Sequence, residues 1–256
     1  MGTMNSLVLS LFPGLGLLDR AFEEQGFCIV RGPDLLWGGD VRRFHPPAGK
    51  FDGIIGGPPC QAHSNLARLN ERRGVRRKPD LIPEFARCVE EAAPNWFLME
   101  NVPAAPDPEC PSYGVHRFVL NNRDLGAEQN RRRSFWFGLW GRPPIELDAF
   151  IERAEPNKEW VSTVCASGIR KPGTESERGH KFPAAYGWSS WANLRKALVW
   201  QGLPADYLAH APLTLKGAFQ CIGNGVPLPM GRAVASAVRR ALEEAQLCAR
   251  EGMYGR

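Results

Sequence analysis

The chain has 256 residues, of which 43% are hydrophobic and 23% are charged, with a formal net charge of +5. This length and composition predict a globular protein with one substantial core and room for a small appended lobe. They exclude a membrane-spanning chain, because no apolar run is long enough, and no N-terminal segment has the pattern of a secretory signal. We therefore expect a soluble, cytoplasmic protein that does not act at a membrane.

Cysteine and histidine give no sign of a metal site or a disulfide framework. The seven cysteines are odd in number and include no Cys-x-x-Cys pair, and none of the five histidines is spaced as a metal pair. We predict a reduced, intracellular protein without a metal. The cysteines are Cys28, Cys60, Cys88, Cys110, Cys165, Cys221 and Cys248.

In the first half of the chain, short apolar segments alternate with helical patterns. This alternation predicts an α/β fold with a doubly wound, mostly parallel sheet. In such sheets ligands collect at the carboxyl ends of the strands. The expected strands are 7–12, 27–30, 51–55 and 96–99, and the expected helices are 17–25, ending at Gly26, and 81–93.

The pattern changes after Trp140. Residues 141–190 are rich in Pro, Gly and charged residues and have little periodicity, which predicts a small irregular second lobe. Helical patterning resumes at 194–200 and at 230–249. We therefore divide the chain into a first domain over 1–140, the small segment 141–190, and a part over 191–256 that returns to the first domain.

Cys60 follows the apolar segment 51–55, within the run Gly-Gly-Pro-Pro-Cys-Gln over 56–61. The two glycines allow close approach of the backbone to a ligand, and the two prolines fix successive φ angles, so the thiol is presented in one direction. This arrangement suits a nucleophile. A buried structural cysteine is the alternative, and partners elsewhere in the chain decide between the two.

Four further segments supply possible partners. A glycine turn covers 13–16, and Glu100-Asn101-Val102 ends a strand. Along an extended chain, alternation would place Gln129, Arg131 and Arg133 on one side, aiming both guanidinium groups at one place. The run 223–227, Gly-Asn-Gly-Val-Pro, predicts a turn before the last helix.

Basic residues gather in two clusters, at 68–78 and at 131–133. Both clusters predict a polyanionic partner. A solvated helix face remains an equal alternative for the first cluster.

In this order, these pieces resemble the DNA (cytosine-5)-methyltransferase family. The resemblance covers residues 7–138 and about 193–240, and its most specific part is Pro-Cys-Gln at 59–61 followed by Glu-Asn-Val at 100–102. It implies a Rossmann-like fold that uses S-adenosylmethionine, with 1–140 as the catalytic and cofactor-binding domain and 141–190 as the target-recognition segment. The stretch between Val102 and Val119 is short for a strand-helix-strand crossover, so one helix is expected to be truncated.

The resemblance also implies the chemistry. The Cys60 thiolate adds to C6 of a flipped-out cytosine and activates C5 for methylation. Protonated Glu100 holds a proton at ring N3. Arg131 or Arg133 binds the base carbonyl and a flanking phosphate while lowering the pKa of the thiol. Loss of the C5 proton then expels Cys60.

Further site residues follow from the resemblance. Asp34 is expected to bind the ribose, Asp40 the adenine amino group, and Asn224 to close the cofactor site. Relatives carry Asp where this chain has Ser10, and usually Phe at the position of His63. The whole predicted cofactor set is Phe12, Pro13, Gly14, Leu15, Gly16, Asp34, Asp40, Pro58 and Asn224, and the DNA-contacting set is Gln61, Ser64, Arg68, Arg72, Arg73 and Gln129.

The expected partner is double-stranded DNA, and the expected state is a monomer. The resemblance implies DNA methylation of the restriction-modification kind, in the cytoplasm of a bacterial or phage-infected cell and at its nucleoid. Two alternatives stay open. The same chemistry could act on tRNA, although the Cys-Phe-Thr tract of that branch is absent, or the chain could be a silent homologue that binds DNA without catalysis.

Overall fold

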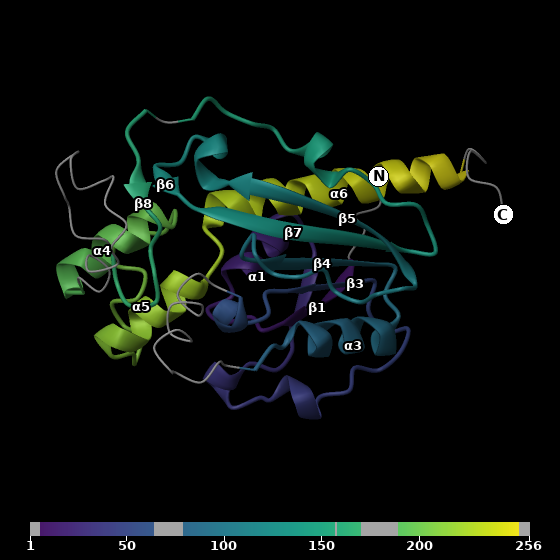
Figure 1. Cartoon of the computed structure of the whole chain (residues 1–256), viewed down its shortest axis with the longest axis horizontal. Helices are drawn as coiled ribbons and strands as arrows, with labels where there is room; N and C mark the ends of the chain where they lie inside the picture. Colours follow the sequence, from purple (N-terminus) through teal and green to yellow (C-terminus); the bar gives the residue numbers. More distant parts are fainter. Residues whose placement is uncertain (1–5, 64–78, 157, 170–188, 251–256) are drawn as a thin grey trace.

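The computed structural model describes residues 6–63, 79–156, 158–169 and 189–250, with side chains to 247. Its centre is a six-stranded sheet in the order β2-β1-β3-β4-β7-β5 (Figure 1). β1, β2, β3 and β4 are parallel, whereas β7 runs antiparallel to both β4 and β5. The predicted mostly parallel sheet is confirmed. Its strands are β1 (Leu7–Leu11), β2 (Cys28–Arg31), β3 (Gly53–Gly56), β4 (Trp96–Asn101), β5 (Tyr113–Asn121) and β7 (Arg132–Trp140).

Helices cover both faces of this sheet (Figure 1). α1 (Leu17–Glu24) and α6 (Leu228–Arg250) pack together on one face, where Phe22, Trp96 and Phe137 lie in the larger core cluster. α3 (Ile82–Ala92) covers the other face through Phe85, which packs edge-on against Phe97. The sheet is therefore doubly wound, as predicted.

A smaller part lies beyond one end of the sheet (Figure 1). It contains the two-stranded sheet of β6 (Gln129–Asn130) and β8 (Val161–Ser162), together with α4 (Trp191–Trp200) and α5 (Leu215–Asn224). Short 3-10 turns complete the described fold: η1 (Leu35–Trp37), η2 (Val41–Arg43), η3 (Cys60–Ala62), η4 (Asn122–Leu125) and η5 (Leu147–Phe150).

The structure refines several sequence-based expectations. β3 begins at Gly53 and not at Phe51, and β4 continues through Glu100 and Asn101. A truncated helix was expected between Val102 and Val119, but residues 102–112 contain no helix and connect β4 directly to β5. The expected turn at 223–227 is wrong in part, because Gly223 and Asn224 form the last residues of α5.

The proposed boundary at Trp140 stays a prediction. Leu147 and Ile151, beyond that boundary, are buried in the core cluster that also contains Phe22 of α1. The first residues after β7 therefore pack onto the sheet domain. Among the described helices, none is long and apolar enough to cross a membrane.

Candidate active site

A rigid turn at the carboxyl end of β3 holds Cys60. The side-chain amide of Asn101, at the end of the neighbouring strand β4, donates a 3.0 Å hydrogen bond to the carbonyl oxygen of Pro58. The same side chain accepts a 2.8 Å hydrogen bond from the backbone N–H of Val102. Asn101 is 1% exposed, so a buried amide ties the Cys60 turn to the adjacent strand. Asn101 was absent from the predicted site residues, although its motif was recognised.

Glu100 and Arg133 form an ion pair beside Cys60. Arg133 Nε lies 2.8 Å from Glu100 Oε1, and both side chains are almost entirely buried. Burial raises the pKa of the Glu100 carboxyl group, while the charge of Arg133 opposes that rise. A methyl group at Gly57 would lie 3.1 Å from Glu100 Oε2, so this glycine leaves room for the carboxyl group.

The electrostatics of Cys60 differ from the expectation in one respect. Burial raises the pKa of its thiol, and the positive charge of Arg133 offsets this only in part. Glu100 adds to the rise when ionised, and Arg131 acts against it. The net effect is therefore a thiol that is harder to ionise than usual, because desolvation exceeds the stabilisation from the two guanidinium groups.

Arg131 does not share the cavity with Arg133. It is 0% exposed, and its guanidinium donates 2.9 Å hydrogen bonds to the backbone oxygens of Val164, Gly223 and Gly225. Burial lowers the pKa of Arg131 to about 9, so the side chain keeps its charge at neutral pH. The expectation that both guanidinium groups aim at one place is corrected: Arg131 joins three chain segments and acts on Cys60 only through its field.

Gln129 is likewise buried, which contradicts its expected contact with DNA. It is 0% exposed, its Nε2 donates to the carbonyl oxygen of Trp200 at 2.9 Å, and its Oε1 accepts from Val164 N at 3.1 Å. The prediction assumed one continuous extended chain. The break between β6 and β7 at Arg131 removes the simple alternation on which it depended.

Two hydrogen bonds fix Gly14 in the glycine turn after β1, one at its backbone nitrogen and one at its backbone oxygen. Asp34 Oδ2 accepts a 2.9 Å hydrogen bond from Gly14 N, and Trp37 Nε1 donates a 2.9 Å hydrogen bond to Gly14 O. Phe12 has a left-handed φ of 57°, a conformation that costs a bulky residue about 1–3 kcal/mol. The two hydrogen bonds to Gly14 thus hold this turn in one shape, and that shape includes the strained backbone of Phe12.

One cavity, of about 590 Å³, joins the glycine turn to the Cys60 turn. The sequence-predicted residues that line it are Phe12, Pro13, Gly14, Leu15, Asp34, Pro58, Cys60, Gln61, Glu100, Arg133 and Asn224. Other predicted residues do not line it. Gly16 is instead the N-cap residue before α1, with a left-handed φ of 73°, and the Asp40 carboxylate pairs with Arg42 at 2.6 Å. Ser64, Arg68, Arg72 and Arg73 lie outside the described residues.

Two polar residues of this cavity, Ser10 and Asp19, were not among the predicted site residues. Ser10 Oγ donates a 2.5 Å hydrogen bond to Asp19 Oδ1, and Arg31 Nε donates a 2.9 Å hydrogen bond to Asp19 Oδ2. Asp19 lies on the face of α1 that also buries Leu18 and Phe22. An acidic residue on the apolar face of a helix is the signal that could have identified it.

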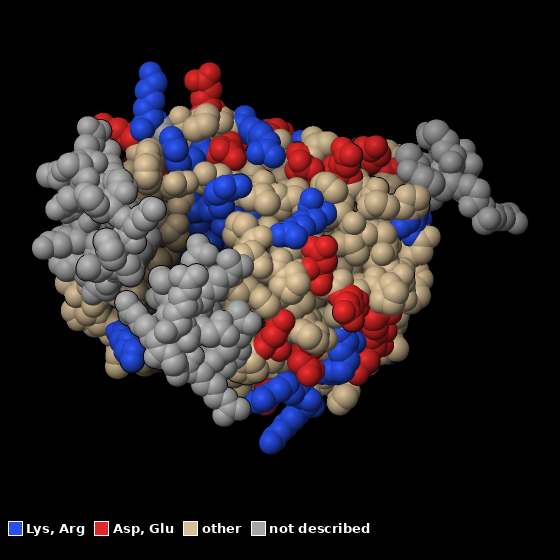
Figure 2. All heavy atoms as spheres, viewed as in Figure 1, with Lys and Arg blue, Asp and Glu red and all other residues tan. Residues whose placement is uncertain are grey.

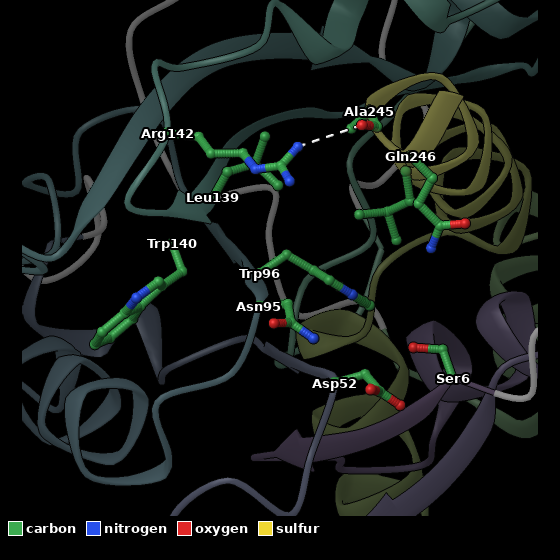
Figure 3. Close-up of a pocket in the computed structure, with 10 residues that line it drawn as sticks. Ser6, Asp52, Asn95, Trp96, Leu139, Trp140, Arg142, Ala245 and Gln246 are labelled. Atoms are coloured by element: carbon green, nitrogen blue, oxygen red, sulfur yellow. Dashed lines mark hydrogen bonds between the residues drawn. The ribbon is translucent and has the colours of Figure 1, made fainter. Parts of the chain in front are cut away.

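A second cavity, of about 530 Å³, lies at the opposite ends of the parallel strands (Figure 3). Trp96, Arg142 and Gln246 are among its lining residues, and Arg142 donates a 3.3 Å hydrogen bond to Ala245 O. Its described lining contains neither cysteine nor histidine. No group of three or more His, Cys, Asp or Glu side chains in the described part of the chain could hold a metal ion.

The fold is that of a doubly wound α/β protein, with a cysteine, a carboxyl group and a guanidinium group in one cavity at the carboxyl ends of its strands. Residues 38–165, half of the chain, match the model of the C-5 cytosine-specific DNA methylase family. The chain belongs to this family.

Several curated relatives are Type II methyltransferases. M.FnuDI of Fusobacterium nucleatum is 32% identical over 52% of this chain and 46% of its own length. M.NgoPII of Neisseria gonorrhoeae is 30% identical over 55% and 49% of the two chains. M.MthTI of Methanothermobacter thermautotrophicus is 32% identical over 69% and 62%. The chain thus spans about half the length of the first two relatives.

Solved structures share the fold over almost the whole chain. A prophage-encoded DNA modification methyltransferase of E. coli is 18% identical, with a TM-score of 0.57 over 93% of this chain and 99% of the other. The Dnmt2 methyltransferase of S. pombe is 12% identical, with a TM-score of 0.61 over 94% and 99%. At these identities the likeness establishes the fold alone.

Proposed function

We propose that this chain methylates C5 of cytosine in double-stranded DNA, with S-adenosylmethionine as the methyl donor. The observation that carries the proposal is the shared cavity of Cys60, Glu100 and Arg133. A cytosine ring is a poor carbon nucleophile, and adding a thiolate to C6 converts C5 into an enamine-like carbon. Family membership supports the same reaction.

Each of the three side chains has a role in this reaction. Cys60 gives up its thiol proton to water and its Sγ forms a bond to C6, while the electron pair displaced from the C5–C6 double bond moves toward C5 and the ring. Glu100, whose pKa is raised by burial, holds a proton at ring N3 and offsets the developing negative charge. Arg133 keeps the carboxyl group in place and adds positive charge beside the ring. After methylation, loss of the C5 proton to water restores the double bond and expels the thiolate.

The residues of the cavity fit S-adenosylmethionine. A methyl group at Gly14 would meet no atom within 4 Å, so open space lies beside the clamped turn. Asp34 supplies carboxylate oxygens suited to ribose hydroxyls, and Asn224 and Pro58 face the same cavity. When bound there, S-adenosylmethionine would supply the methyl group that C5 receives, and its sulfur would keep the electron pair of the broken S–CH₃ bond, which gives S-adenosylhomocysteine. Asp40 pairs with Arg42 and does not line this cavity, so we give it no role in binding S-adenosylmethionine.

Charge supports a nucleic-acid substrate. Lys and Arg side chains gather at a hollow on the face shown in Figure 2. A cytosine inside a duplex must be flipped out to reach a buried thiol, at a cost of a few kcal/mol. We propose that phosphate contacts offset this cost, with Gln61 at the cavity and Ser64, Arg68, Arg72 and Arg73 contacting DNA. The expected setting is a bacterial cytoplasm.

A covalent trap tests the proposal. Fluorine at C5 blocks the final elimination, so a duplex of random sequence that carries 5-fluorocytosine should form a denaturation-resistant adduct in the presence of S-adenosylmethionine. Cys60→Ser should abolish the adduct. Cys221→Ser is the matched control, because Cys221 lines the same cavity, and it should leave the adduct intact. An adduct with 5-fluorocytosine tRNA alone would indicate the RNA reaction, and no adduct with either would refute catalysis.

A further inference from the structure

Carboxyl groups outnumber basic groups among the described lining residues of the cavity, and the excess lies at the end next to the glycine turn. Among its described lining residues, Asp19, Asp34 and Glu100 carry carboxyl groups, whereas Arg133 is the one Lys or Arg. Arg133 pairs with Glu100 at the other end of the cavity. The glycine turn is therefore flanked by two carboxyl groups, Asp34 and Asp19.

These two carboxyl groups are held differently. Both Asp34 oxygens accept backbone hydrogen bonds, from Gly14 N at 2.9 Å and from Leu36 N at 2.7 Å, so this group shapes the loop. Within the described part of the chain, the hydrogen bonds that Asp19 accepts come from side chains, Ser10 at 2.5 Å and Arg31 at 2.9 Å. Each carboxylate oxygen can accept a second hydrogen bond, so Asp19 retains acceptor capacity at the cavity wall.

The position of Asp19 is fixed by three elements. Ser10 belongs to β1, Asp19 to the first turn of α1, and Arg31 to the end of β2. Arg31 lies over Gly16, since a methyl group at Gly16 would come within 2.6 Å of Arg31 Nη2. The Asp19 side chain is only 1% exposed, whereas that of Arg31 is 56% exposed. Water therefore screens the guanidinium more than the carboxylate, which leaves net negative potential on the cavity side.

We propose that Asp19, oriented by Ser10 and Arg31, is the anionic group of this cavity that selects the positively charged α-amino group of S-adenosylmethionine. This inference rests on the proposed function, because it assigns the amino-acid end of the same cofactor to the glycine-turn end of the cavity. A buried carboxylate next to an ammonium group forms a charge-assisted hydrogen bond. Asn at this position keeps the shape and an acceptor for Ser10 but removes the charge.

Calorimetric titration with two ligands isolates this charge. The ligands are S-adenosylhomocysteine and its analogue in which hydrogen replaces the α-amino group. Asp19→Asn should weaken binding of S-adenosylhomocysteine roughly 10-fold to 100-fold, the value of a hydrogen bond to a charged group, and leave binding of the analogue unchanged. Glu23→Gln is the matched control, since Glu23 is an exposed acidic residue of the same helix, and it should change neither affinity.

The outcomes separate this inference from the proposed function. Equal weakening of both ligands by Asp19→Asn, or weakening of neither, would overturn the assignment of Asp19. If the unmodified protein bound neither ligand, the proposed use of S-adenosylmethionine would itself be wrong. Urea unfolding of Asp19→Asn provides the folding check. Burial raises the pKa of Asp19, so removing its charge at neutral pH should not by itself lower stability.

Discussion

Arg133 Nε lies 2.8 Å from Glu100 Oε1, in a pair whose two side chains are 12% and 7% exposed. The pair joins neighbouring antiparallel strands, β4 and β7, next to the Cys60 turn. A buried carboxyl group with a raised pKa and one guanidinium partner can keep a proton while its orientation stays fixed. Substitution of Glu100 is therefore the most direct test of the proposed acid role of this carboxyl group.

Glu100→Gln should lower the methylation rate about 10²- to 10⁴-fold, because an amide cannot transfer a proton to ring N3. The affinity for S-adenosylhomocysteine should change less than about twofold, since the proposed role concerns the base and not the cofactor. Single-turnover rates and calorimetry measure the two effects. Glu91→Gln, at a partly buried position of α3 outside the cavity lining, should change neither quantity. A Glu100→Gln enzyme with an unaltered rate would show that the carboxyl group has no chemical role.

The same substitution should change how stability depends on pH. Burial raises the pKa of Glu100 above its ordinary value of 4.5, so the folded state favours the protonated carboxyl group. The resulting stabilisation is complete below pH 4.5 and is lost as pH rises through the folded-state pKa. Gln does not titrate, so the unfolding free energy of Glu100→Gln minus that of the unmodified protein should increase as pH rises above 4.5. Urea unfolding across pH 5–9 measures this slope, and a flat difference would contradict the assignment.

Arg131 and Arg132 are adjacent in the chain but should differ strongly in their effect on stability. Arg131→Met leaves three backbone carbonyl oxygens without their buried donor and should lower the unfolding free energy by about 3–5 kcal/mol. Arg132→Met, at an exposed position, should change it by less than about 0.5 kcal/mol. Urea denaturation compares the two directly. Similar losses in both variants would refute the structural role given to Arg131.

Gly14 and Gly16 should respond differently to alanine. Gly14→Ala puts a methyl group into open space at a φ of +56°, so we expect a loss of stability of about 1 kcal/mol and a larger loss of cofactor affinity. Gly16→Ala should cost about 1 kcal/mol more, because its methyl group displaces Arg31 from Asp19. In an Arg31→Ala background that extra cost should disappear in a double-mutant cycle. If the extra loss of stability persisted in the Arg31→Ala background, the strain would lie in the backbone of residue 16 and not in a contact with Arg31.

Local sequence patterns were sufficient to predict much of the fold of this protein. The alternation of short apolar strands with amphipathic helices predicted the doubly wound sheet, because strand and helix periodicities are properties of neighbouring residues. The Gly-Gly-Pro-Pro-Cys-Gln run predicted the rigid mounting of Cys60 for the same reason. Helix α5 was missed, since a turn was expected in the Gly-Asn-Gly run and tertiary packing overrode that local preference.

The sequence alone therefore determined the alternation of strands and helices in the first half of the chain, the Cys60 turn and the family resemblance. Only the tertiary structure separated Arg133, which lines the cavity, from Arg131, which is buried against three carbonyl oxygens. It also brought Asp19 into hydrogen-bonding distance of Ser10 and Arg31. The reason is that burial and charge pairing depend on which distant segments of the chain pack together. This packing removes water from Cys60 and Glu100, and the desolvation raises the pKa values of both groups.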